Sequence, residues 1–245
     1  MKVKVYDLEG NVVEEIDTPL FEGEVREELI RRAVLSDESY EYQPKGAYKW
    51  AGMETSARYI GRKGAYATLK NQGQARLPRE ILGGGRHGRV RRIPQSVKGR
   101  RAHPPKPEKI IIERMNKKEY LLALRNALAA SKPIVFVDDL ENIAKTKKAY
   151  SLLSKLIGEE LQEAKESRKR ITGVRRRRKA RAYKVKRVGA VIGSKVLKAF
   201  ENIPGLFVVD VEGLKVKHLA PGGVAQRYVI LTKSALKALE ERVRA

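Results

Sequence analysis

The sequence predicts an α/β protein in which a three-layer globular domain with a parallel sheet core carries a long extended basic loop. Short apolar segments alternate with amphipathic ones through residues 110–245, which is typical of strands and helices in a parallel α/β layer. Residues 69–107, in contrast, show no apolar periodicity that would bury a face. We therefore expect residues 1–41 and 108–245 to form the globular domain, with residues 42–107 inserted in it as the loop.

Residues 1–41 predict a β-hairpin followed by a helix. Apolar and polar residues alternate over Lys2–Tyr6 and again over Asn11–Ile16, and the DLEGN segment that joins them has the residues of a tight turn. After Gly23, five apolar residues share one helical face: Val25, Leu29, Ile30, Ala33 and Val34. The hairpin and the helix thus belong to the globular domain.

Strands and helices alternate through the remainder of the globular domain. The expected strands are Pro133–Asp138, Val188–Ile192, Phe207–Val211 and Tyr228–Thr232. The expected helices are Lys117–Ser131, Thr146–Ile157, Val196–Asn202 and a last one that Ser234 caps and that ends at Val243. Continuous apolar strands suit a parallel sheet covered on both faces, and this is why three layers are expected.

The loop, residues 42–107, is rich in arginine and glycine. It holds 16 Lys or Arg and only two acids, Glu54 and Glu80, and ten of the chain's 20 glycines. Arginine offers forked donors for phosphate oxygens, and glycine lets the backbone approach another molecule closely. A structureless loop of this length inside a domain is usually functional or disordered. We expect the loop to become ordered against RNA.

Four aromatic residues are interleaved with the cations at the start of the loop: Tyr48, Trp50, Tyr59 and Tyr66. Such residues stack on bases and make cation–π contacts, but they also fill small local cores. Both interpretations stay open on the sequence. Within the same stretch, residues 53–69 predict a short helix that Thr55 or Ser56 would cap.

A second basic run, Ser167–Arg187, has twelve basic residues and no acid. The formal charge of the whole chain is +24, of which the loop holds +14 and this run +12, so the remainder is nearly neutral at −2. Charge that is gathered in blocks indicates contact with nucleic acid, whereas charge that serves only solubility would be spread out. The alternative is a pair of solvated charge runs with no partner.

The motifs of catalysis and nucleotide binding are mostly missing. Gly83–Gly88 is glycine-rich but lacks the spacing of a phosphate loop, and Gly193–Lys195 offers only backbone amides that could bind an anion. Asp138 and Asp139 end a predicted strand without a third carboxylate, so we expect them to cap that end. No cysteine is present, which excludes disulfides and thiolate metal sites.

The three histidines, His87, His103 and His218, are far apart and form no close metal-ligand spacing. Two of them lie in the loop, where stacking on RNA or hydrogen bonding to it is the simplest role. We therefore expect neither a metal nor a cofactor, and no enzymatic activity. No apolar run reaches the roughly 18 residues needed to span a bilayer, so no membrane partner is expected.

Several longer motifs resemble one protein family. The runs GQARLPR (Gly73–Arg79) and GGGRHGRVRRIPQSVKGRRAHPPKPEK (Gly83–Lys109) are similar to the large-subunit ribosomal protein L4 family, and to its archaeal and eukaryotic branch in particular. The opening VYDLEGN, VDDLENIAKTK (Val137–Lys147), RRRRKARAYKVKR and HLAPGG…YVILTKSAL (His218–Leu236) match the same family in the same order. The resemblance covers essentially the whole chain.

The resemblance implies a cytoplasmic structural constituent of the large ribosomal subunit. The family has a globular α/β domain on the outer side of the subunit and a loop that reaches through ribosomal RNA to the nascent-peptide exit tunnel. Its partners are then large-subunit rRNA, neighbouring ribosomal proteins, among them protein twenty-two of the large subunit at the tunnel constriction, and the nascent peptide in passing. Support of subunit assembly follows from the same role.

The site residues are carried over from the resemblance and from the charge pattern. The residues expected to line the tunnel are Gly73, Gln74, Arg76 and Arg79. Those expected to bind rRNA from the loop are Lys49, Trp50, Arg58, Arg62, Lys63, Lys70, Arg76, Arg79, Arg86, His87, Arg89, Arg91, Arg92, Lys98, Arg100, Arg101 and His103. Those from the second basic run are Arg175, Arg176, Arg177, Arg178, Lys179, Arg181 and Lys184.

Two other functions compete with this one. An RNA-processing α/β enzyme with a basic clamp would need clustered acids or a cofactor loop at the strand ends, and the sequence offers only Asp138 and Asp139 there. A free-standing regulatory RNA-binding protein would act outside any particle. Fractionation that separates free protein from large subunits distinguishes these functions.

Overall fold

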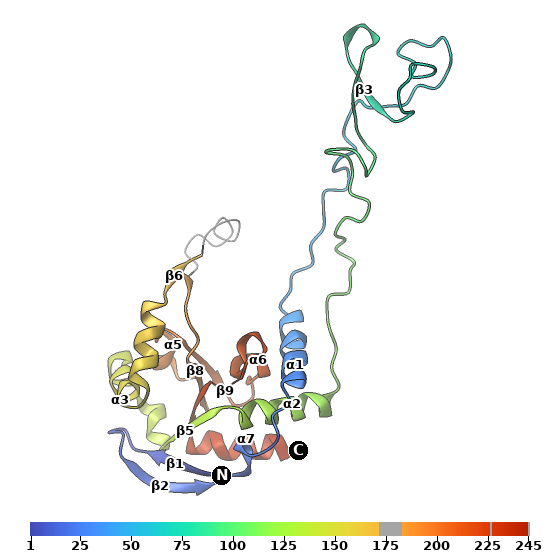
Figure 1. Cartoon of the computed structure of the whole chain (residues 1–245). Coiled ribbons are helices and arrows are strands. Elements are labelled where there is room, and N and C mark those ends of the chain that lie inside the picture. The colour runs from blue at the N-terminus through green and yellow to red at the C-terminus, as the bar shows by residue number, and fades with distance from the viewer. Residues whose placement is uncertain (172–182, 226, 245) are drawn as a thin grey trace. The chain divides into compact units, whose positions relative to one another are not determined.

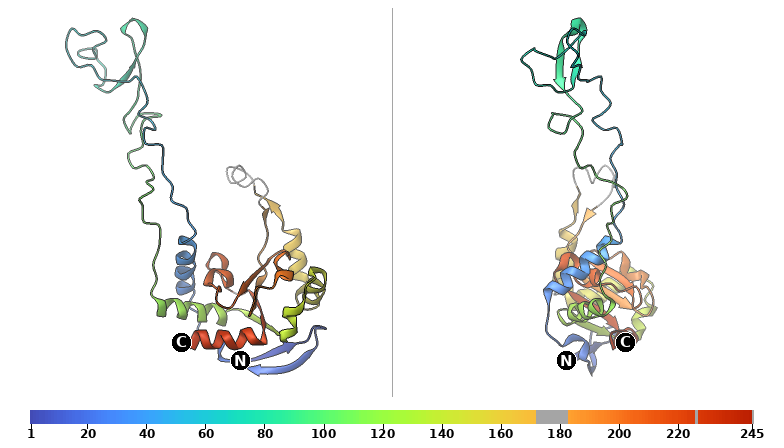
Figure 2. Two further views of the ribbon diagram at one scale, coloured as in Figure 1. Left: turned by 180° about the vertical axis from the view of Figure 1, so that it is seen from behind. Right: turned by 90° about the vertical axis from the view of Figure 1, so that its right-hand side faces the viewer.

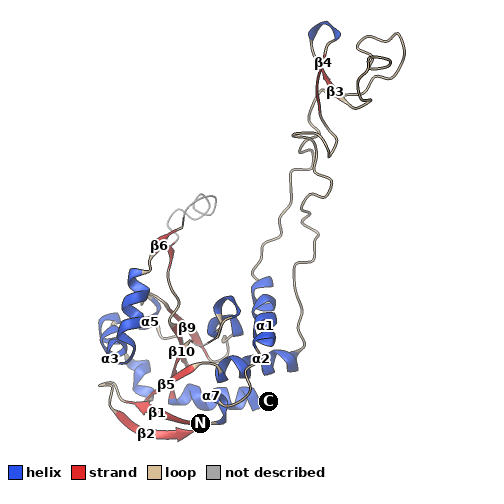
Figure 3. Ribbon diagram, viewed as in Figure 1, coloured by secondary structure: helices blue, strands red, loops and turns tan. Residues whose placement is uncertain are grey.

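The computed structural model describes residues 1–171, 183–225 and 227–244, and the chain divides into two compact units. The globular unit comprises Met1–Glu41 and Ile112–Ala245, and the basic unit comprises Tyr42–Ile111. Regular helices and strands are concentrated in the globular unit, while most of the basic unit is loop (Figure 3). No helix among the described residues is both long and apolar enough to cross a bilayer.

A six-stranded sheet forms the centre of the globular unit (Figure 1). Its strand order is β2 (Val12–Asp17), β1 (Lys2–Tyr6), β5 (Lys132–Phe136), β10 (Tyr228–Thr232), β8 (Gly189–Gly193) and β9 (Leu206–Asp210). The β1–β2 pair is antiparallel, which confirms the predicted hairpin, and all other pairs are parallel. The mostly parallel sheet of the sequence-based prediction is therefore confirmed.

Helices cover both faces of this sheet and bury two apolar clusters (Figure 2). One face packs against α1 (Glu27–Ser39), α2 (Lys117–Ala129), α6 (Val216–Leu219) and α7 (Lys233–Arg244). The other face packs against η3 (Asp138–Asn142), α3 (Thr146–Glu166) and α5 (Lys198–Glu201). Successive strand residues point to opposite faces, so Val135 lies in the first cluster while Ile134 and Phe136 lie in the second. The expected three layers are confirmed.

Several element ends differ from the prediction. Val25 precedes α1 and is exposed, so it does not belong to the helical face. α3 is kinked at Ile157, the predicted end, where the backbone is not helical (φ −134°, ψ 38°), and a further helical segment with buried Leu161 and Ala164 continues to Glu166. The helix expected at residues 196–202 is shortened to α5.

The cap predicted for the last helix is also wrong. Ser234 lies inside α7, and its backbone N–H donates to Asp138 Oδ1 at 2.7 Å. The side chain that caps the helix is Thr232, whose Oγ1 accepts from the Ala235 N–H at 3.2 Å. A carboxylate and a hydroxyl thus satisfy two of the amides that every helix leaves unpaired at its N-terminus.

The basic unit has one small hairpin, in which β3 (Arg79–Ile81) pairs with β4 (His87–Val90) through η2 (Gly83–Gly85). The incoming and outgoing segments of the unit lie side by side (Figure 2). Backbone hydrogen bonds join them, from the Ala47 N–H to the Pro105 carbonyl at 3.2 Å and between Arg58 and Arg79 in both directions.

The helix expected in residues 53–69 does not form. Gly64 has φ +79°, which an α-helix does not accommodate, and the Leu69 N–H donates to the Ile60 carbonyl at 3.0 Å, which is not a helical bond. Two apolar side chains of this region are buried: Ala57 and Leu69 are each 1% exposed. Two buried side chains are far fewer than the buried residues of the two apolar clusters in the globular unit.

Candidate RNA interface

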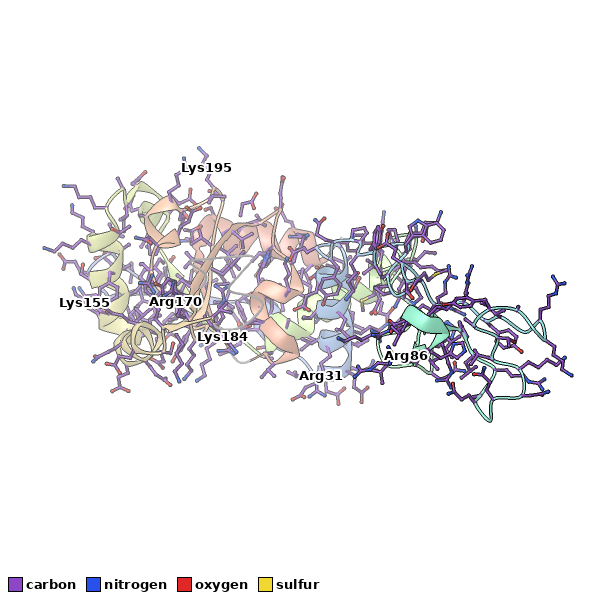
Figure 4. The ribbon with its side chains drawn as sticks, turned by 90° about the horizontal axis from the view of Figure 1, so that it is seen from above. Arg31, Arg86, Lys155, Arg170, Lys184 and Lys195 are labelled. Carbon is purple, nitrogen blue, oxygen red and sulfur yellow. The ribbon has the colours of Figure 1, made fainter. Side chains whose placement is uncertain are left out.

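The cations of the basic unit point into solvent. Most of the predicted RNA-binding side chains in it are exposed, and only Arg79, His87 and Arg91 are half-buried. The exposed ones are Lys49, Trp50, Arg58, Arg62, Lys63, Lys70, Arg76, Arg86, Arg89, Arg92, Lys98, Arg100, Arg101 and His103. Arg86 lies where η2 meets β4, at the turn of the hairpin (Figure 4). A surface of this charge is suited to a polyanion.

One ion pair holds the hairpin of the basic unit. Arg91 Nε donates to Glu80 Oε1 at 2.7 Å, and the Arg91 guanidinium also donates to the Val97 carbonyl at 3.1 Å. The hydrogen bond from Arg91 holds the pKa of Glu80 below its ordinary value. Arg91 is among the residues expected to bind rRNA, and its guanidinium is paired with a carboxylate of its own chain.

Buried polar atoms without partners gather in the same hairpin. Arg79 Nε and both ring nitrogens of His87 are inaccessible and make no hydrogen bond, and these are three of the four such atoms among the described residues. A buried donor without a partner costs about 1–3 kcal/mol. The hairpin therefore carries unsatisfied hydrogen-bonding capacity that a bound polar molecule would relieve.

Among the residues that the structure describes, four other than glycine have a left-handed backbone, and all four lie in the basic unit. They are Ala67, Asn71, Arg92 and Lys98, with φ between 54° and 73°. Such conformations are uncommon for residues with a Cβ and are found where surrounding structure holds them, often at functional sites. Two of the four, Arg92 and Lys98, are exposed cations among the predicted RNA-binding residues.

The aromatic residues of the basic unit do not fill a core. Tyr48, Trp50, Tyr59 and Tyr66 are all exposed, with Tyr66 at 71%. The interpretation as a small local core is therefore wrong, and the flat faces are open to stacking on bases. Tyr48 donates its hydroxyl proton to Glu54 Oε1 at 2.5 Å, which raises the pKa of the phenol, and Lys49 Nζ lies 5.9 Å from the Trp50 ring centroid.

The second basic run extends from a short hairpin of the globular unit. Strands β6 (Lys169–Arg170) and β7 (Tyr183–Lys184) pair antiparallel, and Lys184 is exposed (Figure 4). The Arg168 guanidinium lies over the Tyr183 ring at 4.4 Å. Six residues predicted to bind RNA lie outside the described residues: Arg175, Arg176, Arg177, Arg178, Lys179 and Arg181. The hairpin shows where the run leaves and rejoins the globular unit.

At the end of the sheet where α/β enzymes bind substrates, two carboxylates are engaged by groups of the protein itself. Glu141 Oε1 accepts from the Ser194 N–H at 2.8 Å and from the Ser194 hydroxyl at 2.6 Å. The anion position expected at Gly193–Lys195 is thus filled by a carboxylate of the chain, while Asp138 is used as a cap of α7. The described residues hold no group of three His, Cys, Asp or Glu that could bind a metal ion.

The globular unit also contains a stacked pair of rings, Phe207 and His218, that was not predicted from the sequence. His218 stacks on Phe207 with ring centroids 4.2 Å apart, and its Nδ1 accepts from the Lys215 N–H at 3.2 Å. Burial and the neighbouring lysines lower the pKa of His218 to about 4. Phe207 and His218 are 11 positions apart in the printed sequence and belong to different elements, so no local pattern could have paired them.

These features define a strongly basic α/β protein with a separate unit that is rich in exposed Lys and Arg. The family described as "Ribosomal protein L4/L1 family" matches residues 14–242. A protein named "Large ribosomal subunit protein uL4" from Methanocaldococcus jannaschii is 39% identical, with 99% of each chain covered. Proteins of the same name from Nanoarchaeum equitans and Methanoculleus marisnigri are each 38% identical and covered over 98% or more of both chains. The chain belongs to the ribosomal protein L4/L1 family.

Proposed function

We propose that the chain is a structural constituent of the large ribosomal subunit, located in the cytoplasm as part of the ribosome, and that it binds large-subunit rRNA. The observation that carries the proposal is the basic unit itself, which exposes most of its cations and its aromatic faces and leaves Arg79 Nε and the ring nitrogens of His87 without hydrogen bonds. The names of the relatives, which match over nearly their full length, support the particle.

Binding through the basic unit follows from its electrostatics. Each phosphate that a Lys or Arg neutralises releases condensed counterions, so affinity falls steeply with salt. Few base edges are accessible in double-stranded RNA, so the shape of the RNA and its unpaired bases provide the specificity. The exposed aromatic residues, such as Trp50 and Tyr66, suit unpaired bases, and the arginines suit the phosphates around them.

We further propose that the tip of the basic unit lines the nascent-peptide exit tunnel. Gly73, Gln74 and Arg76 are exposed in a turn where Gly73 has φ +69°, and Arg79 opens β3 beside them. Protein twenty-two of the large subunit and the passing nascent peptide are the partners of this tip. The globular unit contacts neighbouring ribosomal proteins and the outer rRNA.

Sucrose-gradient fractionation tests the proposal. A tagged chain expressed in its own cells is expected to sediment almost entirely with large subunits and translating ribosomes. After subunit dissociation in low magnesium, the protein stays with the large subunit. A mainly free pool would instead indicate a regulatory RNA-binding protein, and a pool on the small subunit would contradict the proposal outright.

Removal of residues 64–90 tests the division of labour between the two units. The deletion removes β3, η2 and β4 but no residue of the two apolar clusters in the globular unit. We expect the melting temperature of the free protein to stay within a few degrees of the parent, while incorporation into large subunits is lost or strongly reduced. A large drop in melting temperature would show that the basic unit stabilises the globular unit.

A further inference from the structure

A cavity of about 370 Å³ opens on the globular unit beside the Phe207–His218 stack. Its walls include Arg187, Arg227, Glu38 and Glu41. All the lining residues belong to the globular unit. Its volume is near the lower end of the range for small-molecule sites, so a ligand of the size of one nucleotide is appropriate.

One side of this cavity is lined by a pair of stacked rings. The rings of Phe207 and His218 are nearly parallel, at 21°, and the Arg187 guanidinium carbon lies 5.8 Å from the Phe207 ring centroid. Aromatic rings and planar guanidinium groups are the side chains on which unpaired RNA bases stack. The backbone of Arg187 is held by Arg227, whose guanidinium donates to the Arg187 carbonyl.

The polar lining fits the edge of a base better than it fits a phosphate. Glu38 and Glu41 bring carboxylates to the cavity, and these repel a phosphate but accept from the exocyclic amino group of a base. Lys217 pairs with Glu41, which compensates part of the positive charge nearby. With a pKa of about 4, His218 is neutral at pH 7, and since its Nδ1 accepts a hydrogen bond, its Nε2 carries the proton.

The cavity adjoins the end of the second basic run. Arg187 is the last residue of the second basic run, and it follows β7 directly after Val185 and Lys186. The described cations at this end of the run, Lys184 and Lys186, therefore lie within a few positions in the chain of a residue that lines the cavity. The cavity is also lined by Gly222, where a Cβ would meet no other atom within 4 Å.

We propose that this cavity binds one unstacked purine base of an RNA strand, with the base against the Phe207–His218 stack. The proposal rests on the proposed function in that the strand is RNA held by the basic runs. It adds a specific base-binding site on the globular unit. A purine is favoured over uracil because it has more surface to stack, and adenine and guanine carry an exocyclic amino group that uracil lacks.

Histidine signals in NMR test the proposal on the full chain. The protein has three histidines, of which His218 lies in the cavity and His87 and His103 lie in the basic unit. In ¹³C-labelled protein the ring signal of His218 is assigned by its loss in His218→Asn. Adenosine monophosphate is expected to shift it in a saturable manner, uridine monophosphate to bind roughly fivefold or more weakly, and inorganic phosphate to leave it unmoved.

A variant and its matched control sharpen the result. Phe207→Leu keeps an apolar side chain but removes the flat ring, so the apparent Kd for adenosine monophosphate is expected to rise roughly fivefold or more. Tyr150→Leu makes the same kind of change on α3, outside the cavity, and is expected to leave that Kd unaltered. If Phe207→Leu does not fold, the comparison of the three ligands on the parent protein still decides.

The outcomes separate this proposal from the proposed function. An equal shift with inorganic phosphate would show a simple anion site, and no shift with any nucleotide would show that the cavity binds no base. Either result overturns the base-binding site. A single-stranded oligoribonucleotide that moves the signals of His87 or His103 but not that of His218 would overturn it while supporting RNA binding by the basic unit. Failure of the proposed function would appear instead as no binding of that RNA at low salt.

Discussion

The two units of the chain are stabilised in opposite ways. In the globular unit, helices on both faces of the sheet bury two large apolar clusters. In the basic unit, the only fully buried apolar side chains among the described residues are Ala57 and Leu69. Apolar burial is the main term that offsets the entropy of ordering a chain, at about 25 cal/mol per Å². The globular unit can therefore specify its own conformation, whereas the basic unit needs a partner.

The two units also differ in backbone strain and in the number of buried polar atoms that lack a hydrogen bond. Over residues 1–171, 183–225 and 227–244, all four left-handed residues with a Cβ and three of the four unpartnered buried polar atoms lie in the basic unit. In the globular unit the polar side chains at the sheet's edge are paired, as Glu141 is with Ser194. The comparison teaches that strain and unsatisfied groups are located where contacts from another molecule are expected to compensate them.

The largest effect expected from this comparison is on stability. Phe200→Ala removes a fully buried ring from the globular unit and should lower the free energy of unfolding by about 3–5 kcal/mol. Leu69→Ala removes a side chain that is equally buried but lies in the basic unit, and we expect it to change the same free energy by less than about 0.5 kcal/mol. Urea unfolding followed by far-UV circular dichroism measures both.

Trp50 provides an internal check on that result. It is the only tryptophan and lies in the basic unit, so its fluorescence reports that unit alone. We expect no cooperative fluorescence transition at the urea midpoint of the circular dichroism curve. Coincident transitions, or a Leu69→Ala loss as large as that of Phe200→Ala, would mean that the two units fold as one and that the contrast is mistaken.

The second effect is on RNA affinity. Replacing four exposed arginines of the basic unit by glutamine should weaken binding of a large-subunit rRNA fragment roughly a hundredfold at 0.1 M salt and reduce the slope of log K against log salt by about 3. The residues to change are Arg86, Arg89, Arg100 and Arg101. Filter binding across a salt series measures both quantities.

The matched control removes four exposed lysines from the globular unit outside the second basic run. These are Lys147, Lys148, Lys195 and Lys237, each changed to glutamine. The loss of net charge is the same, but we expect the salt slope to change by less than about 1. Equal slopes for the two variants would show that RNA responds to total charge and not to the basic unit.

Much of the globular unit could be predicted because its signals are local. The alternation in Lys2–Tyr6 and the apolar run Tyr228–Thr232 each gave a strand with the observed bounds. The errors are at element ends, where a partner distant in sequence decides. Thr232 caps α7 in place of Ser234. The Ser234 N–H instead donates to Asp138, which lies 96 positions earlier in the chain. No window of the sequence contains that pair.

The candidate site was predictable in composition but not in geometry. The density of Lys and Arg identified the basic unit, and the interleaved aromatics left two interpretations that only the exposure of Tyr66 and its neighbours could separate. The small hairpin β3–β4 was missed because its strands are three and four residues long and carry no periodicity. The Phe207–His218 stack was missed because tertiary packing brings the two rings together.

The third effect concerns glycine. Gly205 has φ +90°, and a Cβ there would lie 2.8 Å from the Lys186 carbonyl oxygen, so Gly205→Ala should destabilise the globular unit by about 2 kcal/mol. Gly64 in the basic unit has φ +79° with nothing within 4 Å of a Cβ, and Gly64→Ala should leave the unfolding transition unchanged. Thermal unfolding followed by circular dichroism compares the two. A shift as large for Gly64→Ala would mean that the free basic unit already defends its backbone conformation.

The smallest effect is the pH dependence that His218 gives to the globular unit. Burial holds its pKa at about 4, below the ordinary 6.5, so the unfolded chain binds more protons between these values. Stability from this group is therefore complete above about pH 6.5 and is lost as the pH falls towards 4. Because the ring is partly exposed, screening reduces the loss between pH 7 and pH 5 to about 1 kcal/mol. In His218→Asn that part of the pH dependence disappears, as urea unfolding at the two pH values would measure. A variant that loses as much stability as the parent would show that another group is titrating, and with it that the ring is not held neutral on Phe207.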